Sequence, residues 1–165
     1  IKIRKKNIKY FINENFLNIY NNLIKLTRNK SLYNKNKKDT FYDRMIILYF
    51  HFSFLLKTYK NVETKEDLQK FFDYFVRQIE LSIREIGYGD ATINKKMKDY
   101  VNLLFSIIDK INNWELKNDH EKGEIINLFI DDTLNIENYV KYFDKYRLFL
   151  SKNTFNNLAK DIITL

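Results

Sequence analysis

The sequence predicts an all-α protein, a single compact bundle of about six to seven helices. The chain of 165 residues contains no proline, the residue that most strongly interrupts helices. Its apolar residues recur at three- and four-residue spacing almost throughout, which is the pattern of amphipathic helices. Its length is that of one domain with a substantial core. We therefore expect one helical domain over residues 1–165.

The first half of the chain predicts two helices joined by a polar loop from Thr27 to Asp39. The second helix is expected from about Thr40 to Tyr59, and its near-continuous apolarity predicts burial on most sides. Its most apolar part, 45–56, is shorter than the roughly 20 residues of a membrane-spanning helix and contains His51, so a buried central helix is expected. The apolar residues of the first helix fall on one face, which we call its apolar stripe: Ile8, Phe11, Ile12, Phe16, Ile19, Tyr20, Leu23 and Ile24.

Two strongly amphipathic helices are expected next. Thr64 to Asp67 resembles a capping box with Asp in place of the usual Glu, and it predicts the start of the third helix. Gly87 is expected to end this helix in the left-handed conformation, after which Asp90 or Thr92 can cap a fourth helix. The third stripe is Leu68, Phe71, Phe72, Phe75, Val76, Ile79, Ile83 and Ile86, and the fourth is Ile93, Met97, Tyr100, Val101, Leu104, Ile107, Ile108 and Ile111.

The corner between these helices holds two of the three glycines of the chain, Gly87 and Gly89. In a chain this poor in glycine, we expect one of them to occupy a backbone position with positive φ. Beyond the fourth helix, shorter helices are expected at about Glu121–Asp132 and Ile136–Arg147, with Ser151 capping the last helix.

The net charge of +8 is concentrated at the N-terminus. Residues 1–40 contain 11 basic and 2 acidic side chains, while the remainder contains 18 basic and 19 acidic ones. Such a segment is expected to attract phosphate, from anionic lipid headgroups or from RNA, although a solubilising surface is the alternative. Arg4, Lys5, Lys6 and Lys9 are the residues predicted to bind an anionic surface. The other basic residues of the segment are Lys2, Lys25, Arg28, Lys30, Lys35, Lys37 and Lys38.

Several classes of site are not expected. The chain has no cysteine and therefore neither disulfides nor thiolate ligands. His51 and His120 are far apart, and neither belongs to a metal-ligand pattern, so we expect no metal and no cofactor. Gly87-Tyr88-Gly89 follows a helix, whereas a dinucleotide-binding glycine loop follows a strand. Because no nucleophile and base stand at catalytic spacing, we expect no enzymatic activity.

The position of several polar residues within the expected helices predicts their surroundings or partners. Arg44 enters an apolar helix, so it must form an ion pair or remain at the rim. His51 on that helix is interpreted as a hydrogen-bonded structural histidine. Arg84 suits the negative end of the third helix, whereas Glu85 does not and is expected to have a basic partner. Asp90 is interpreted as a helix cap. The lysines after the corner, Lys95, Lys96 and Lys98, are expected on a solvated face.

Two stretches carry a resemblance. Residues 39–44, Asp-Thr-Phe-Tyr-Asp-Arg, are followed by Leu48, His51, Phe54, Leu55 and Leu56. Residues 83–90, Ile-Arg-Glu-Ile-Gly-Tyr-Gly-Asp, are followed by Lys95-Lys96-Met97-Lys98. These stretches resemble the D-T-F-x-x-R with L-x-x-H-x-x-L pattern and the L-R-E-x-G-x-G-D with P-K-K-M/V-K pattern of the ubiquinol-cytochrome c chaperone family. The resemblance covers about 39–114, with Asn94 in place of the family's proline and Tyr88 in place of an aliphatic residue.

The resemblance implies a non-catalytic assembly chaperone that holds newly made cytochrome b, or another cytochrome bc complex subunit, near the membrane. A second assembly factor and an anionic membrane surface or ribosome are further possible partners, and DNA is not expected. The implied location is peripheral on the inner membrane, at the bacterial cytoplasmic or mitochondrial matrix face. The aromatic content of 16% predicts exposed rings that suit an apolar client. The residues predicted to contact a partner are Arg44, His51, Arg84, Glu85, Tyr88, Asp90, Lys95 and Lys96.

An RNA-binding or ribosome-binding helical module is the alternative function. It is supported by the same N-terminal charge and by Tyr33 and Tyr42, which stand near lysines in the sequence. This hypothesis predicts aromatic rings that stack on bases within a positive surface, and an affinity that falls steeply with salt.

Overall fold

The computed structural model describes residues 2–33, 40–132 and 135–160, and for residues 2–13 it describes the course of the helix without the side chains. Within these ranges the secondary structure is entirely helical, which confirms the predicted all-α bundle. The α-helices are α1 (Lys2–Thr27), α2 (Phe41–Tyr59), α3 (Lys65–Glu85), α4 (Asp90–Lys110), α5 (Asp119–Asn127) and α6 (Ile136–Lys152). Three short 3-10 helices are η1 (Lys30–Leu32), η2 (Trp114–Leu116) and η3 (Phe155–Ala159).

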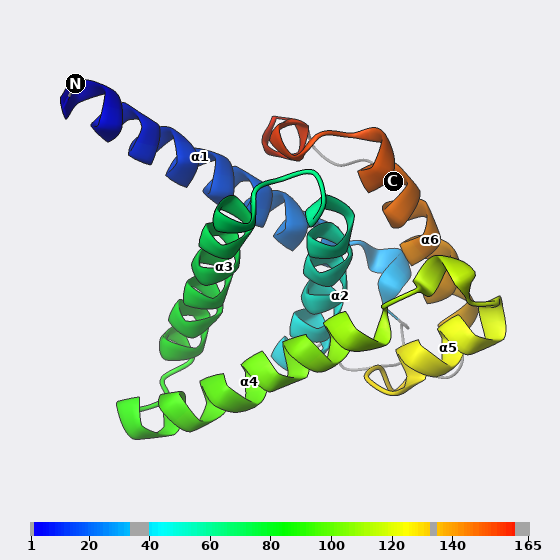
Figure 1. Ribbon diagram of the computed structural model, residues 1–165. Coiled ribbons are helices and arrows are strands. Elements are labelled where there is room, and N and C mark those ends of the chain that lie inside the picture. The colour runs from blue at the N-terminus through cyan, green and yellow to red at the C-terminus, as the bar shows by residue number, and fades with distance from the viewer. Residues whose placement is uncertain (1, 34–39, 133–134, 161–165) are drawn as a thin grey trace.

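Helix α2 lies at the centre of the bundle and contacts α1, α4 and α6 (Figure 1). Helix α3 runs beside it, and α4 crosses below both from the corner at the lower left of the view (Figure 1). Helices α5 and α6 pack together on the other side, and η3 returns to α1. The first half of α1 extends away from the other helices (Figure 1).

The start of α2 is fixed by a full capping box. Thr40 Oγ1 accepts a hydrogen bond from the Asp43 N–H at 3.2 Å, and Asp43 Oδ2 accepts one from the Thr40 N–H at 3.2 Å. Every side chain from Met45 to Leu55 is buried, as the apolarity of this segment predicts. No helix in the described ranges combines the length and apolar character needed to cross a bilayer. Full burial of each large side chain contributes about 1.5–3 kcal/mol, so α2 dominates the core.

Aromatic rings from four elements surround α2. Phe52 stacks on Phe75 of α3 with ring centroids 3.6 Å apart, and Phe54 meets the edge of Trp114 at 5.2 Å. Phe50 stacks on Phe143 of α6 at 5.1 Å. Contacts of this kind add to area burial, so much of the high aromatic content serves the core.

Helix α6 is attached to α2 by hydrogen bonds as well as by apolar contact. The Tyr146 hydroxyl donates to the His51 carbonyl oxygen at 3.2 Å. Farther along α2, the Tyr59 hydroxyl lies 3.0 Å from the Leu150 carbonyl oxygen and 2.8 Å from that of Asn153. These bonds satisfy phenol groups that burial would otherwise leave unpaired.

The corner between α3 and α4 requires one positive φ. Gly87 has φ +100°, which confirms its predicted role as the end of α3. Gly89 has φ −73° and ψ 158° and is the N-cap residue of α4. Asp90 is therefore the first helical residue instead of a cap, and Thr92 lies inside the first turn. Ile86 was expected on the buried stripe but is 51% exposed, because α3 ends at Glu85 and Ile86 is the residue that follows it.

The remaining boundaries differ in detail from the prediction. Thr64 Oγ1 caps α3 by accepting from the Asp67 N–H at 3.1 Å, but its hydroxyl then donates to Asp67 Oδ2. The loop after α1 contains η1, whose Leu32 is fully buried. Ser151 does not cap a helix, since it lies within α6 and donates to the Leu148 carbonyl oxygen. Thr154 takes the capping role for η3.

Replacing Gly87 with valine is expected to destabilise the protein by about 1–3 kcal/mol, because a β-branched residue cannot adopt φ +100° without strain. A Cβ at this position would meet nothing within 4 Å, so the cost is conformational and not steric. Gly89→Val is the matched control, since its backbone is extended and its surroundings are equally open. Urea unfolding measures both variants, and equal midpoints would contradict the assignment.

Candidate functional site

Arg84 links the two helices of the corner. Its Nη2 lies 2.8 Å from Glu80 Oε1 one turn earlier on α3, and its Nη1 pairs with Asp90 Oδ1 at the start of α4. Glu80 also accepts from Arg77 Nη1 at 2.9 Å. The hydrogen bonds from Arg84 and Arg77 lower the pKa of Glu80. Arg77, Arg84 and Asp90 are solvent-exposed and Glu80 is half-buried, so these ion pairs fix the geometry of the corner but add little to the stability of the fold.

The outer side of the corner is partly apolar. Tyr88 is 41% exposed, and Lys96 Nζ lies 4.4 Å from the centre of its ring, a cation–π arrangement. Ile86, two residues before Tyr88 in the sequence, is exposed as well. We define the corner surface as Arg84, Ile86, Tyr88, Asp90 and Lys96. Sequence reasoning identified four of these residues and assigned Ile86 to the core.

Glu85 and Lys95 are exposed residues near this surface. The basic partner expected for Glu85 is not found, because Glu85 forms no ion pair within the part of the chain that the structure describes. Glu80, one turn earlier and nearer to Arg84, forms the ion pairs instead. Lys95 lies on the solvated face of α4, as predicted.

His51 is a core residue. Its side chain is fully buried, with Nδ1 2.7 Å from the Ile47 carbonyl oxygen and Nε2 2.8 Å from the Tyr142 hydroxyl. Because a carbonyl oxygen only accepts, Nδ1 carries the proton and Nε2 accepts from Tyr142. This arrangement agrees with the structural interpretation of His51. It corrects the prediction that His51 contacts a partner, since no part of the side chain reaches the surface.

Arg44 and Arg28 line one cavity of about 170 Å³ between α1, α2 and α3. Both arginines are exposed at its edge, so Arg44 lies at the rim, one of the two positions expected for it. We call this the arginine cavity. The other lining residues are Tyr20, Ile24, Thr27, Phe41, Met45, Leu48, Ile79 and Ser82. Sequence reasoning counted Arg28 only as part of the N-terminal charge, because nothing in the sequence places the end of α1 beside the start of α2.

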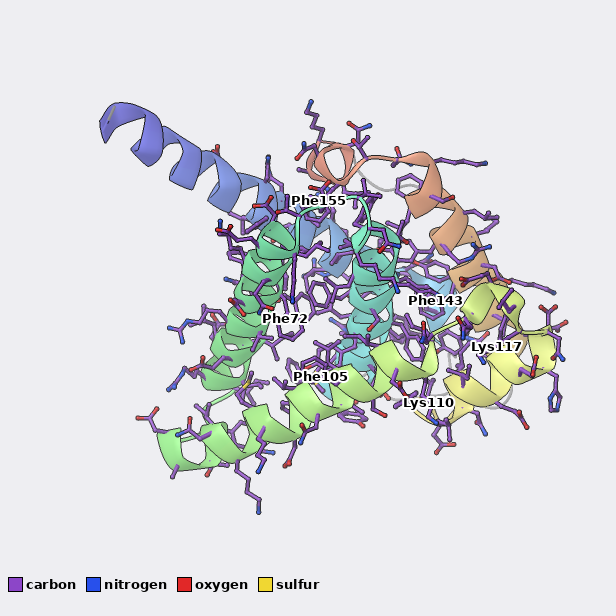
Figure 2. The ribbon with its side chains drawn as sticks, viewed as in Figure 1. Phe72, Phe105, Lys110, Lys117, Phe143 and Phe155 are labelled. Atoms are coloured by element: carbon purple, nitrogen blue, oxygen red, sulfur yellow. The ribbon has the colours of Figure 1, made fainter. Side chains whose placement is uncertain are left out.

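A second exposed apolar region lies where α3 faces α4. Phe105 is 52% exposed and stacks on Phe72 with ring centroids 5.6 Å apart. Figure 2 labels both side chains, Phe72 on α3 and Phe105 on α4. A groove of about 400 Å³ beside Phe105 is also lined by Leu56 and Lys60. Sequence reasoning missed Phe105, and the available signal was an aromatic residue outside the apolar stripe of its helix.

The basic residues predicted to bind anionic surfaces lie in the first half of α1. Arg4, Lys5, Lys6 and Lys9 belong to this helix, but their side chains lie outside the described part of the structure. Lys35, Lys37 and Lys38 lie outside the described residues, as does Asp39 of the first family-like stretch. Among described residues, no cluster of three or more His, Asp or Glu side chains is arranged to hold a metal ion.

The burial of His51 leads to a pH-dependent stability. Desolvation lowers the pKa of His51 to about 4, although its bond to Ile47 opposes this. In the unfolded chain, His51 takes up a proton near pH 6.5, whereas in the folded protein it stays neutral to a lower pH. The free energy of unfolding therefore decreases as the pH falls from about 6.5 toward 4. In His51→Gln the amide can keep both hydrogen bonds but does not take up a proton. Its free energy of unfolding is therefore expected to fall over this pH range by up to about 3 kcal/mol less than that of the unsubstituted protein. Unfolding free energies measured between these pH values check the effect.

The matched control for this measurement is His120→Gln, because the His120 side chain is largely solvent-exposed. This variant is expected to keep the pH dependence of the unsubstituted protein. A His51→Gln profile parallel to that of the unsubstituted protein would contradict the buried neutral histidine.

Comparison with known proteins gives one positive result. No curated protein and no solved structure matches the chain. Residues 36–117 match the family model described as ubiquinol-cytochrome C chaperone. The matched segment contains both family-like stretches in full, together with α2, α3, α4 and the corner surface. Over residues 36–117, just under half of its length, the chain is therefore similar to the ubiquinol-cytochrome C chaperone family.

Proposed function

We propose that this protein is an assembly chaperone that binds newly made cytochrome b during biogenesis of the cytochrome bc complex. The match of residues 36–117 to the ubiquinol-cytochrome C chaperone family supports an assembly role in that complex and a role without catalysis. The observation that carries the proposal is that the matched segment, 36–117, includes the exposed corner surface.

The chemistry of the corner surface supports client binding. Ile86 and Tyr88 expose apolar area that packing does not require, and a binding interface needs such an apolar centre. Around them, Arg84 and Asp90 hold each other in position, while Lys96 lies over the Tyr88 ring. Polar groups held in this way lose little conformational freedom when a partner binds. An apolar helix with a polar end would meet both requirements of this surface.

The proposed location is peripheral on the inner membrane, at the bacterial cytoplasmic or mitochondrial matrix face. The basic first half of α1, which projects from the bundle, is the segment that would meet an anionic surface (Figure 1). A second assembly factor is a further proposed partner, and the groove beside Phe105 offers a separate apolar surface for it.

An RNA-binding function is supported by the charge but less by the tyrosines. Tyr33 is half-buried, and its hydroxyl donates to the Thr27 carbonyl oxygen. This bond holds the residue against the end of α1, whereas a stacking platform needs a free ring face. Tyr42 is exposed and remains the candidate for such stacking. We therefore favour the chaperone function.

Removal of the protein from its native cell is expected to lower the amount of assembled cytochrome bc complex while transcripts of its subunits persist. Complementation with Arg84→Gln/Tyr88→Ser is expected to restore less complex and to capture less cytochrome b, because the variant lacks the polar and apolar contacts of the corner. Native gels and affinity capture measure the two effects. Circular dichroism and melting temperature are expected to stay near those of the unsubstituted protein, since both residues are exposed.

The matched control is Leu148→Ser/Lys152→Gln on α6, which also removes one exposed apolar residue and one cation. It is expected to behave like the unsubstituted protein. Full cytochrome b capture by the folded Arg84→Gln/Tyr88→Ser variant would refute the corner as the client site. Unchanged levels of assembled complex after removal of the protein would refute the assembly function.

The N-terminal segment is expected to bind anionic vesicles, with about 1 kcal/mol contributed by each basic residue near the surface. Replacing Arg4, Lys5, Lys6 and Lys9 with glutamine is expected to abolish sedimentation with phosphatidylglycerol vesicles, and salt is expected to weaken the binding of the unsubstituted protein. Phosphatidylcholine vesicles serve as the control. Equal sedimentation with both lipids would contradict the prediction.

A further inference from the structure

The groove beside Phe105 lies between the C-terminal ends of α2 and α4 and has a volume of about 400 Å³. Leu56 on α2 and Ile108 on α4 are half-buried and line it together with the exposed Phe105, so the recess is mainly apolar. We call it the Phe105 groove. An apolar recess that a folded chain leaves open to solvent points to a partner that covers it.

Three aromatic rings form a row from the core to this groove. Phe52 is fully buried, and its ring centroid lies 6.1 Å from that of Phe72, which stacks on Phe105 at 5.6 Å. Figure 2 labels Phe72 and Phe105. The Phe105 ring is thus held by its neighbour while half of the residue stays exposed. An aromatic anchor already held in place loses little conformational freedom on binding, and such anchors carry much of the binding free energy of an interface.

Each side of the Phe105 groove carries one charge without an ion partner. Lys60 directly follows α2, Asp109 belongs to the last turn of α4, and both are exposed. Within the described part of the chain, neither forms an ion pair with the other or with a third residue. The other cation of the groove, Lys57, is already engaged, because its Nζ lies 2.6 Å from Glu115 Oε2 and 3.2 Å from the Ile111 carbonyl oxygen. The groove therefore offers one cation on its α2 side and one carboxylate on its α4 side.

This arrangement is complementary to a copy of itself. At a two-fold interface, each contact between two residues of different copies is repeated in the reverse direction. An axis through Phe105 brings the two Phe105 rings together and places each Lys60 opposite Asp109 of the other copy. A partner of uniform charge would instead meet one like charge, which costs binding free energy.

The net charge of the chain does not oppose such a contact. Basic residues are concentrated in residues 1–40, whereas the remainder carries 18 basic and 19 acidic side chains. The Phe105 groove belongs to this nearly neutral remainder, so two copies can approach each other there without strong repulsion. Asn112, which also lines the groove, offers a donor and an acceptor to the amide of its own copy.

We propose that a second copy of the chain covers the Phe105 groove, so that the protein is a symmetric dimer with Phe105 at its centre. Aromatic anchors lie at the middle of this interface and two Lys60–Asp109 ion pairs at its rim, the usual division of an interface into an apolar core and a polar rim. The inference does not depend on the proposed chaperone function. A second assembly factor that uses the same groove has to displace the second copy.

Sedimentation equilibrium of the purified full chain in about 0.15 M salt, which screens distant charges, tests the dimer. The expected mass is twice the 20.2 kDa of one chain. Phe105→Ser is expected to raise the dissociation constant at least about hundredfold, because each dimer loses two anchors. Leu128→Ser is the matched control, since Leu128 is 64% exposed outside the groove, and it is expected to remain dimeric. Circular dichroism and melting temperature verify that each variant is folded.

Charge reversal tests the two-fold arrangement. Lys60→Glu alone and Asp109→Lys alone place like charges opposite each other at two positions, so each is expected to weaken the dimer at least about tenfold. An equimolar mixture of these two variants is expected to dimerise again, because both positions of the mixed dimer then join opposite charges. Lys145→Glu and Glu124→Lys reverse exposed charges outside the groove and are expected to leave the dimer unchanged.

A monomer at about 100 μM protein would overturn the proposal, because specific interfaces of ordinary size bind more tightly than this. A dimer that persists at full strength in folded Phe105→Ser would place the interface elsewhere. Single charge reversals without effect, or a mixture that stays monomeric, would refute the two-fold arrangement. A monomeric protein whose Phe105→Ser variant assembles less cytochrome bc complex in the cell would assign the groove to another assembly factor instead.

Discussion

The burial of α2 on almost all sides is the constraint on which the rest of the structure depends. A helix with this many large apolar side chains must be covered by other elements, and α1, α3, α4 and α6 provide the cover. Its one imidazole is accommodated because Ile47 and Tyr142 satisfy both nitrogens of the neutral ring. The charged residues of the corner surface accordingly lie at the ends of α3 and α4 and not along the buried part of α2.

The corner surface and the arginine cavity both lie at the C-terminal end of α3. The corner surface begins at Arg84, and Ser82, one of the residues that line the arginine cavity, precedes it by less than a helical turn. One surface offers exposed apolar area with an oriented polar rim, and the other is a cavity of about 170 Å³ with apolar walls.

The sequence predicted the elements whose determinants are local. The stripes and caps located α2, α3 and α4 closely. The scarcity of glycine pointed to Gly87 or Gly89 as the position of positive φ, and the end of the apolar stripe of α3 pointed to Gly87. Features that depend on tertiary packing were missed. Arg28 and Arg44 line one cavity only because α1 and α2 converge, and the exposure of Ile86 depends on where α3 ends. The surface role predicted for His51 failed because residues 91 and 95 positions later in the chain, Tyr142 and Tyr146, enclose it.

The attachment of α6 also bears on which part of the chain can fold by itself. The segment that matches the family ends at residue 117, whereas α6 begins at Ile136. Without α6, the face of α2 that bears Phe50 and Phe54 would lose Phe143, and His51 would lose Tyr142. The boundary of similarity is therefore not a boundary of autonomous folding. Residues beyond 117 therefore close the part of the core over Phe50, His51 and Phe54 that the matched segment leaves open.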